Sequence, residues 1–125
     1  MGEQALPFRI HHVQVAIPPG RDEAARKFYV GVLGMEEIPK PPSLAARGGL
    51  WCRLQGAELH LGVEAEFRPA RKAHPAFSVD GLDALRERLR AHGVPVLVDE
   101  FVPGRQRFYC QDPFGNRLEF VEAGG

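Results

Sequence analysis

The feature that most constrains this chain is an order of elements that occurs twice. A strand, a helix and three strands are expected over about residues 8–64 and again over about 74–122, with the polar segment 65–73 between them. Matching positions in the two halves lie 59 to 62 residues apart; the matched pairs are His12 with His74 and His60 with Glu119. A repeat of this length is too long for a solenoid unit. It predicts one α+β domain, residues 1–125, made of two βαβββ modules related by a pseudo-twofold axis.

Local signals set the expected elements. Apolar residues at helical spacing predict one helix that ends at Leu33 and a second that starts at an Asp80 cap and ends before Gly93. Alternation and turn residues predict the strands 8–17, 35–38, 50–54, 58–63, 74–79, 94–98, 106–110 and 117–121. Residues 1–7 and 39–49 are expected to be irregular, and the segment from Asp112 to Asn116 is typical of a turn.

Charge and hydropathy exclude several classes of partner. The formal net charge is +0, so the chain has no basic field to hold nucleic acid or an anionic membrane surface. No apolar run approaches the roughly 20 residues of a membrane span, and the N-terminus lacks the apolar core of a signal peptide. We therefore expect a cytoplasmic protein, with Cys52 and Cys110 as reduced thiols that face the core.

Strand parity singles out four polar residues. The apolar faces of the strands should pack on the two helices, and the opposite faces should form a second surface. Each half places one polar residue on that surface from its first strand and one from its last; the four are His12, His60, His74 and Glu119. Three imidazoles and a carboxylate are ligands that suit a divalent transition metal, and zinc, nickel, iron, manganese and cobalt all remain open.

A single histidine on a sheet face is more often structural than a metal ligand. His11 and His92 are expected to be structural, because His11 shares the parity of Val13 and His92 lies near a helix C-terminus. Glu119 alone would be an ordinary surface carboxylate. The case for a metal site therefore depends on the four residues recurring at matched positions in both halves.

Aromatic and cationic residues sit near the same positions. Trp51 and Arg53 share one face of their expected strand, and Arg107 and Tyr109 share one face of theirs. They either line a substrate pocket, with the arginines holding an anionic group, or lie on an outer surface. The sequence leaves both interpretations open. Glu58, on the face of His60, and Glu119 are the candidates for a catalytic base.

Two motifs resemble a known superfamily. The segment HHVQVAI followed by KFYVGVLGM, and the closing segment QDPFGNRLEFVE, resemble the vicinal oxygen chelate (glyoxalase/bleomycin resistance protein/dioxygenase) superfamily over about residues 8–122. The resemblance implies paired βαβββ modules that form a cup-shaped mixed sheet, often in a homodimer. It places the metal ligands on His12, His74 and Glu119 and a fourth ligand position on His60, where glyoxalase I carries a carboxylate.

The resemblance also implies a function. It favours a metal-dependent enzyme that chelates two adjacent oxygens of a small substrate, either a lyase or isomerase that transfers a proton or a ring-cleaving dioxygenase. The alternatives are a metal-free drug- or metabolite-binding protein of the bleomycin-resistance type and a domain with a vestigial site. Whether the two modules pair within one chain or between chains is left open.

Overall fold

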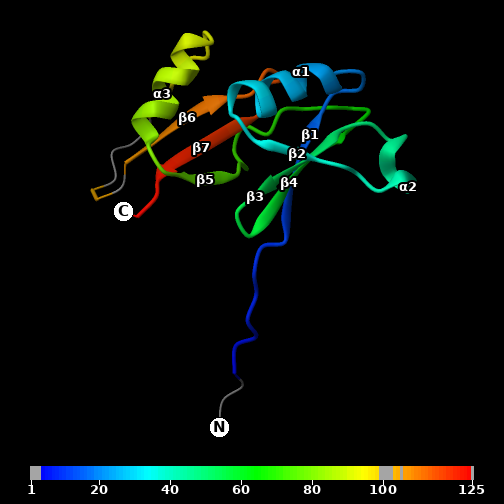
Figure 1. Ribbon diagram of the computed structural model, residues 1–125, viewed down its shortest axis with the longest axis horizontal. Helices are drawn as coiled ribbons and strands as arrows, with labels where there is room; N and C mark the ends of the chain where they lie inside the picture. The colour runs from blue at the N-terminus through cyan, green and yellow to red at the C-terminus, as the bar shows by residue number, and fades with distance from the viewer. Residues whose placement is uncertain (1–3, 99–102, 105, 125) are drawn as a thin grey trace.

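The computed structural model describes residues 4–98, 103–104 and 106–124 (Figure 1). In chain order the elements are β1 (His12–Ile17), α1 (Asp22–Arg26), the π-helical segment η1 (Lys27–Val32), β2 (Glu36–Ile38), α2 (Pro42–Ala45), β3 (Leu50–Leu54), β4 (Ala57–Val63), β5 (Ala76–Val79), α3 (Leu82–Ala91), β6 (Arg107–Gln111) and β7 (Arg117–Glu122). Within the described ranges, no helix is long and apolar enough to cross a bilayer.

The strands form two mixed sheets, one in each half of the chain. The first has the order β1-β4-β3-β2, and the second has the order β5-β7-β6. In both, the first strand of the half runs parallel to the last, and the other pairings are antiparallel. The same pairing in both halves confirms the α+β class with two related modules.

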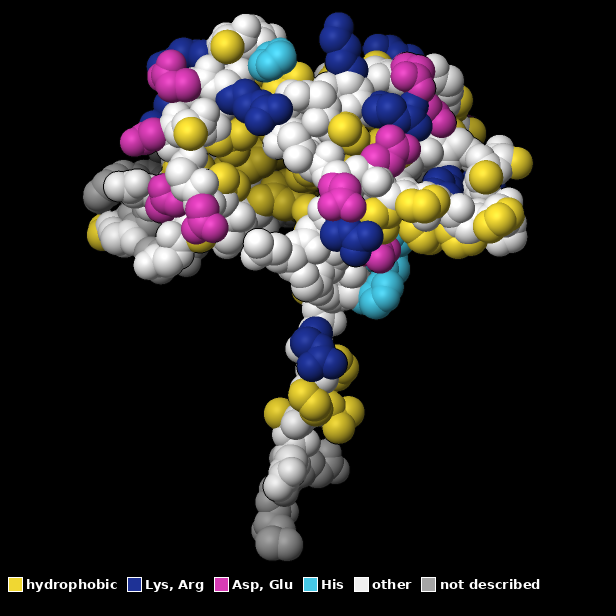
Figure 2. Space-filling view, in the orientation of Figure 1, with side chains coloured by type: hydrophobic (Ala, Val, Ile, Leu, Met, Phe, Trp, Pro, Cys, Tyr) yellow, Lys and Arg dark blue, Asp and Glu magenta, His cyan; other side chains and the backbone are white. Residues whose placement is uncertain are grey.

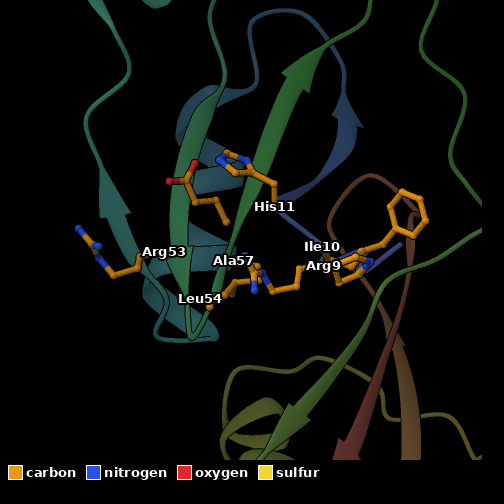
Figure 3. Close-up of a pocket in the computed structure, with 10 residues that line it drawn as sticks. Arg9, Ile10, His11, Arg53, Leu54 and Ala57 are labelled. Atoms are coloured by element: carbon orange, nitrogen blue, oxygen red, sulfur yellow. The ribbon is translucent and has the colours of Figure 1, made fainter. Parts of the chain in front are cut away.

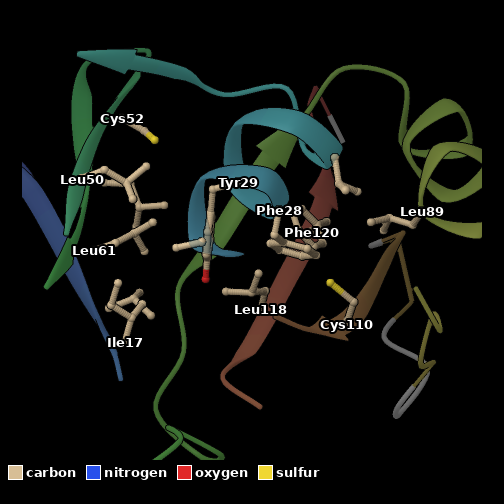
Figure 4. Packing of buried hydrophobic residues seen from close by; sticks show 14 of the residues in the cluster. Ile17, Phe28, Tyr29, Leu50, Cys52, Leu61, Leu89, Cys110, Leu118 and Phe120 are labelled. Carbon is tan, nitrogen blue, oxygen red and sulfur yellow. The ribbon is translucent and has the colours of Figure 1, made fainter. Parts of the chain in front are cut away.

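The core lies between the two sheets, and the helical segment η1 supplies its centre. Tyr29 and Phe28 lie between Leu61 of the first sheet and Leu118 and Phe120 of the second (Figure 4). The strongly buried apolar residues are Val15, Ile17, Ala25, Phe28, Tyr29, Val32, Leu50, Cys52, Leu59, Leu61, Leu82, Leu89, Phe108, Cys110, Leu118 and Phe120. The helical stripe and most of the strand residues predicted to face the core therefore lie in it or against it, whereas Val63 is 36% exposed.

The two cysteines are core residues, as expected. Both are free and completely buried. Burial raises the pKa of Cys52 to about 11 and that of Cys110 to about 12, so both thiols stay protonated at neutral pH.

Buried polar groups join the two modules. Tyr29 Oη donates to Asp112 Oδ2 at 2.7 Å, and Asn116 Nδ2 donates to the same oxygen at 2.8 Å and to the Ala16 carbonyl at 2.9 Å. The Asp112 side chain also accepts the backbone N–H groups of Phe114 and Asn116. The segment predicted as a turn is a turn, and it also fixes the start of β7 against module one.

Several predicted boundaries are wrong. The first strand begins at His12 rather than residue 8, because its partner β4 begins at Ala57 and pairs Glu58 with His12. Residues 4–11 run on beyond the sheet. The expected strand 94–98 is reduced to a bridge between Leu97 and Tyr109, and the residues directly after it, 99–102, lie outside the described ranges. The irregular segment 39–49 contains the short helix α2.

The predicted cap of the second long helix is also wrong. Gly81, at φ +89°, occupies the N-cap position, and no cap side chain bonds to the helix there. The carboxylate of Glu122, at the end of β7, instead accepts the N–H groups of Gly81 and Leu82, each at 3.1 Å. These backbone hydrogen bonds hold the pKa of Glu122 below its usual range. The last strand therefore fixes the start of α3.

Candidate metal centre

One pair of predicted ligands lies on the first sheet. The ring of His60 on β4 stacks between two others: its centroid is 4.3 Å from that of His12 and 4.0 Å from that of Trp51. His60 Nε2 lies 2.8 Å from Glu58 Oε1, and His11 Nδ1 lies 2.9 Å from His12 Nδ1. We call His12, Trp51, Glu58 and His60 the first half-site.

Parity and register explain this cluster. β4 pairs with β1 on one side and β3 on the other, with His60 opposite Gln14 and Trp51. The neighbours of His60 in β4, Leu59 and Leu61, point into the core, so His60 points away from it. The hydrogen bond with His60 lowers the pKa of Glu58 most, and nearby histidines lower it further. The pKa therefore lies below its usual range, and this carboxylate is ionised at neutral pH.

The second pair of predicted ligands lies on the second sheet. His74 Nε2 lies 2.8 Å from Glu119 Oε1, and Arg107 Nη1 donates to Glu119 Oε2 at 3.3 Å. The Tyr109 ring is 5.6 Å from that of His74, and the Arg117 guanidinium lies over Tyr109 at 4.1 Å. We call His74, Arg107, Tyr109, Arg117 and Glu119 the second half-site.

The environment of Glu119 keeps it charged. Burial raises the pKa of Glu119, but hydrogen bonds from His74 and Arg107 outweigh it and hold that pKa below its usual range. His74 Nδ1 donates to the Lys72 carbonyl at 2.8 Å. With Nδ1 held in this way, a metal would bind His74 at Nε2 in exchange for its hydrogen bond with Glu119, which is the usual arrangement behind a metal-bound histidine.

A single copy of the chain does not bring the four predicted ligands together. His12 and His60 lie on one sheet, and His74 and Glu119 lie on the other. Among residues 4–98, 103–104 and 106–124, no group of three or more His, Cys, Asp or Glu side chains is placed to hold a metal ion. The structure therefore contains two separate pairs.

The predicted substrate residues divide in the same way. Trp51 belongs to the first half-site, and Arg107 and Tyr109 belong to the second. Arg53 lies opposite Glu58 in the sheet, but it is largely exposed and pairs with Glu36 at 3.3 Å. Arg117 was not among the predicted residues, although it shares the strand parity of Glu119 and could have been found by that signal.

A family model matches this architecture over nearly the whole chain. The model for the glyoxalase/bleomycin resistance protein/dioxygenase superfamily matches residues 9–120. The chain belongs to this superfamily. No curated protein gives a significant match to the chain.

Solved structures agree with the superfamily. A structure from Bacillus anthracis assigned to the glyoxalase family has a TM-score of 0.91 and 48% identity, and the match covers 96% of this chain and 98% of that one. A lactoylglutathione lyase from Agrobacterium tumefaciens has a TM-score of 0.70 and 25% identity, covering 94% and 95%. A glyoxalase/dioxygenase from Nostoc punctiforme has a TM-score of 0.74 and 22% identity, covering 97% of both chains, and supports the fold alone.

Proposed function

We propose that this chain is a divalent-metal-dependent enzyme that acts on a small substrate with two adjacent oxygens. The metal would be held by His12, His60, His74 and Glu119. The observation that carries the proposal is that the four residues form two pairs of metal-compatible donors on equivalent strands of the two modules. A relative of 25% identity is a lactoylglutathione lyase, whose reaction class agrees with this proposal.

The chemistry of the donors fits such an ion. Imidazole nitrogens and one carboxylate are donors that zinc, nickel, iron, cobalt and manganese accept. Glu119 is ionised, as a ligand must be, and the Lys72 carbonyl orients His74. Neither pair alone supplies enough ligands for a stable site.

We propose that two copies of the chain complete the site. In the described residues, β1 and β5 each pair with a single strand and so leave one edge of their sheets open. A twofold dimer that places the start of β1 of one copy beside the start of β5 of the other would bring the first half-site of one copy to the second half-site of its partner. The twofold axis would then create two equivalent sites.

The side chains around the ligands suit proton transfer. A bound divalent ion would supply a Lewis acid for the negative charge that develops on the substrate oxygens. Glu58, or Glu119 when it is not a ligand, would accept a proton from the carbon beside a carbonyl. Trp51 and Tyr109 would shield the reacting atoms from water, and Arg107 would hold Glu119 in place. Ring-cleaving oxygenation by an iron-bound form is the other reaction that this donor set allows.

A second candidate function is metal-free binding of a drug or metabolite. One observation favours it: His60 and Glu119 already have side-chain partners in the chain, namely Glu58, His74 and Arg107. Both polar groups are therefore satisfied without an ion. In this alternative, the stacked rings of the first half-site would bind a flat ligand.

Metal content separates the two candidates. We expect purified protein, offered zinc, nickel, manganese, cobalt or iron, to retain about one ion per chain by elemental analysis. His74→Ala and Glu119→Gln should lower the affinity by at least about tenfold, because each removes a ligand or its charge. His92→Ala, at the end of α3, is the control and should change nothing. Protein that stays metal-free, or equal losses in all three variants, would favour the binding protein.

Substrate assays then identify the reaction. Hemithioacetals, hydroxyketones and catechols each present two adjacent oxygens, and they differ in the bond that reacts. Turnover of the first two classes would indicate proton transfer, and oxygen uptake with catechols would indicate ring cleavage. Glu58→Gln should abolish turnover but keep metal binding if Glu58 is the base.

A further inference from the structure

The segment before β1 exposes its apolar side chains. Residues 4–11, which we call the arm, continue from β1 without a helix or a strand of their own and project from the body of the molecule (Figures 1 and 2). Leu6, Phe8 and Ile10 are 71%, 87% and 66% exposed. Their alternation places all three on one side of an extended chain, which is the pattern of a strand with one buried face.

The apolar side chains of the arm pack little on their own module. A pocket of about 660 Å³ lies between it and the β3–β4 hairpin, lined by Arg9, Ile10 and His11 on one side and by Arg53, Leu54 and Ala57 on the other (Figure 3). A row of large apolar side chains is rarely as exposed as Phe8 is here, and such a surface indicates a partner.

The open edge of β5 offers backbone groups to such a partner. The N–H of Glu119 donates to the Pro75 carbonyl, and the N–H of Ala123 donates to the Val79 carbonyl, so the odd-numbered residues of this segment face β7. Because backbone direction alternates, the N–H and C=O groups of Ala76 and Ser78 point to the open edge. Within the described ranges, β5 has no strand on that side.

In the arm, as in β5, the backbone groups of the even-numbered residues point to the open edge. The His11 carbonyl accepts the N–H of Glu58, and the Ile17 carbonyl accepts the N–H of Glu64, so odd-numbered residues face β4. If the arm keeps the extended alternation of β1, the backbone groups of Phe8 and Ile10 point to the open edge. Their side chains then lie on the face of His12, just as Ala76 and Ser78 lie on the face of His74.

We propose that the arm of one copy adds as an antiparallel strand to β5 of a second copy, with Ile10 opposite Ala76 and Phe8 opposite Ser78. The same register places His12 opposite His74 of the partner subunit. A parallel arrangement with those histidines side by side would direct the arm away from β5. The mode of binding is strand addition to a free edge. The inference rests on the homodimer proposed above.

The side chains fit this register. Ala76 and Ser78 are small and exposed, and opposite residues of an antiparallel pair share one face of the sheet. Phe8 and Ile10 would therefore cover them and form an apolar wall beside the His74 and Glu119 of the partner subunit. The substrate would thus carry an apolar group next to its paired oxygens, and the arm would select for it.

Two double variants, which alter opposite faces of the arm, test the proposal in the full-length chain. The double variant Phe8→Ser/Ile10→Ser removes the proposed wall, and Pro7→Ser/Arg9→Ser alters the opposite face as a matched control. By sedimentation velocity over a concentration series, we expect the first variant to weaken dimerisation by about tenfold or more, with the control close to wild type. Equal behaviour of the two variants, or no dimer in the wild type, would overturn the proposal.

A cross-link tests the register directly. Opposite residues of an antiparallel pair have Cα atoms about 5.5 Å apart, within the range of a disulfide. Phe8→Cys/Ser78→Cys should give a covalent dimer under mild oxidation, whereas Arg9→Cys/Ser78→Cys should not. The native cysteines are buried and do not compete. A disulfide within one chain, or none, would overturn the proposal.

These outcomes are distinguishable from failure of the proposed metal site. A chain that forms the covalent dimer but binds no metal keeps the arm contact and overturns the metal-dependent function. A chain that binds metal as a dimer, with no response to either arm variant and no cross-link, overturns only the arm contact.

Discussion

At Asp112 one carboxylate accounts for much of the polar contact between the two modules. It is 4% exposed and accepts hydrogen bonds from the side chains of Tyr29 and Asn116 as well as from the backbone. Burial is the main reason that the pKa of Tyr29 lies well above its usual range, and the nearby Asp112 carboxylate raises it further. The phenol therefore remains a donor. Removing such an acceptor leaves several buried donors without a partner.

Asp112→Ala should therefore lower the free energy of unfolding by about 2–4 kcal/mol, because Tyr29 and Asn116 would each lose a buried acceptor. Urea denaturation of the two proteins measures the difference. Asp83→Ala is the control: this side chain is 93% exposed and pairs with Arg86, so the change should stay below about 1 kcal/mol. A loss at Asp112 no larger than at Asp83 would contradict the role of the network.

The same residues show what strand parity can and cannot predict. Alternation identified His12, His60 and Glu119 as facing away from the core, because a strand has a fixed period of two. The contact of Tyr29 with Asp112 joins residues 83 positions apart. No local pattern contains such a pairing, so the sequence predicted a turn there and not a link between modules.

At the level of elements, the partner strand decides where an element begins. The composition of residues 8–11 suits a strand, yet β1 starts at His12 because β4 provides no partner before Ala57. For the same reason, the expected cap at Asp80 is not used. The carboxylate of Glu122, brought close by the pairing of β5 with β7, accepts the first N–H groups of α3 instead.

Glu122 should make stability depend on pH. Its folded pKa lies below the ordinary value of 4.5, so its contribution is complete above pH 4.5 and disappears as the pH falls through the lowered folded value. Glu122→Gln should therefore lower the urea midpoint at pH 7, and the difference from wild type should shrink below about pH 4.5 as Glu122 becomes neutral.

Glu87→Gln is a suitable control for this titration. Glu87 also lies on α3, but it is largely exposed and pairs only with Arg90 among the interactions described for it. Its replacement should change the urea midpoint little at any pH. A difference between wild type and Glu122→Gln that stays constant from pH 7 to acid would show that charge at the start of α3 is not the cause.

At the level of the whole molecule, the duplication separates the predicted ligands into halves. The sequence identified the four residues because the two modules repeat, and it left open whether the modules pair within or between chains. Pairing between chains depends on which sheet edges remain open after folding, and this cannot be read from periodicity. In the described residues, each sheet has two edge strands, and one of them in each sheet begins at or near a predicted ligand: β1 at His12, and β5 two residues after His74.

A site shared between copies predicts that two defective chains restore each other. Each site of the proposed dimer combines the first half-site of one copy with the second half-site of the other. In a mixed dimer of His12→Ala and Glu119→Ala chains, one site therefore receives both substitutions and the other receives neither. Mixed dimers isolated with two different affinity tags should therefore hold about half of the wild-type metal. Each homodimeric variant should hold little. If every site lay within one chain, each site of the mixed dimer would carry one substitution, and its metal content would stay at the level of the two parents.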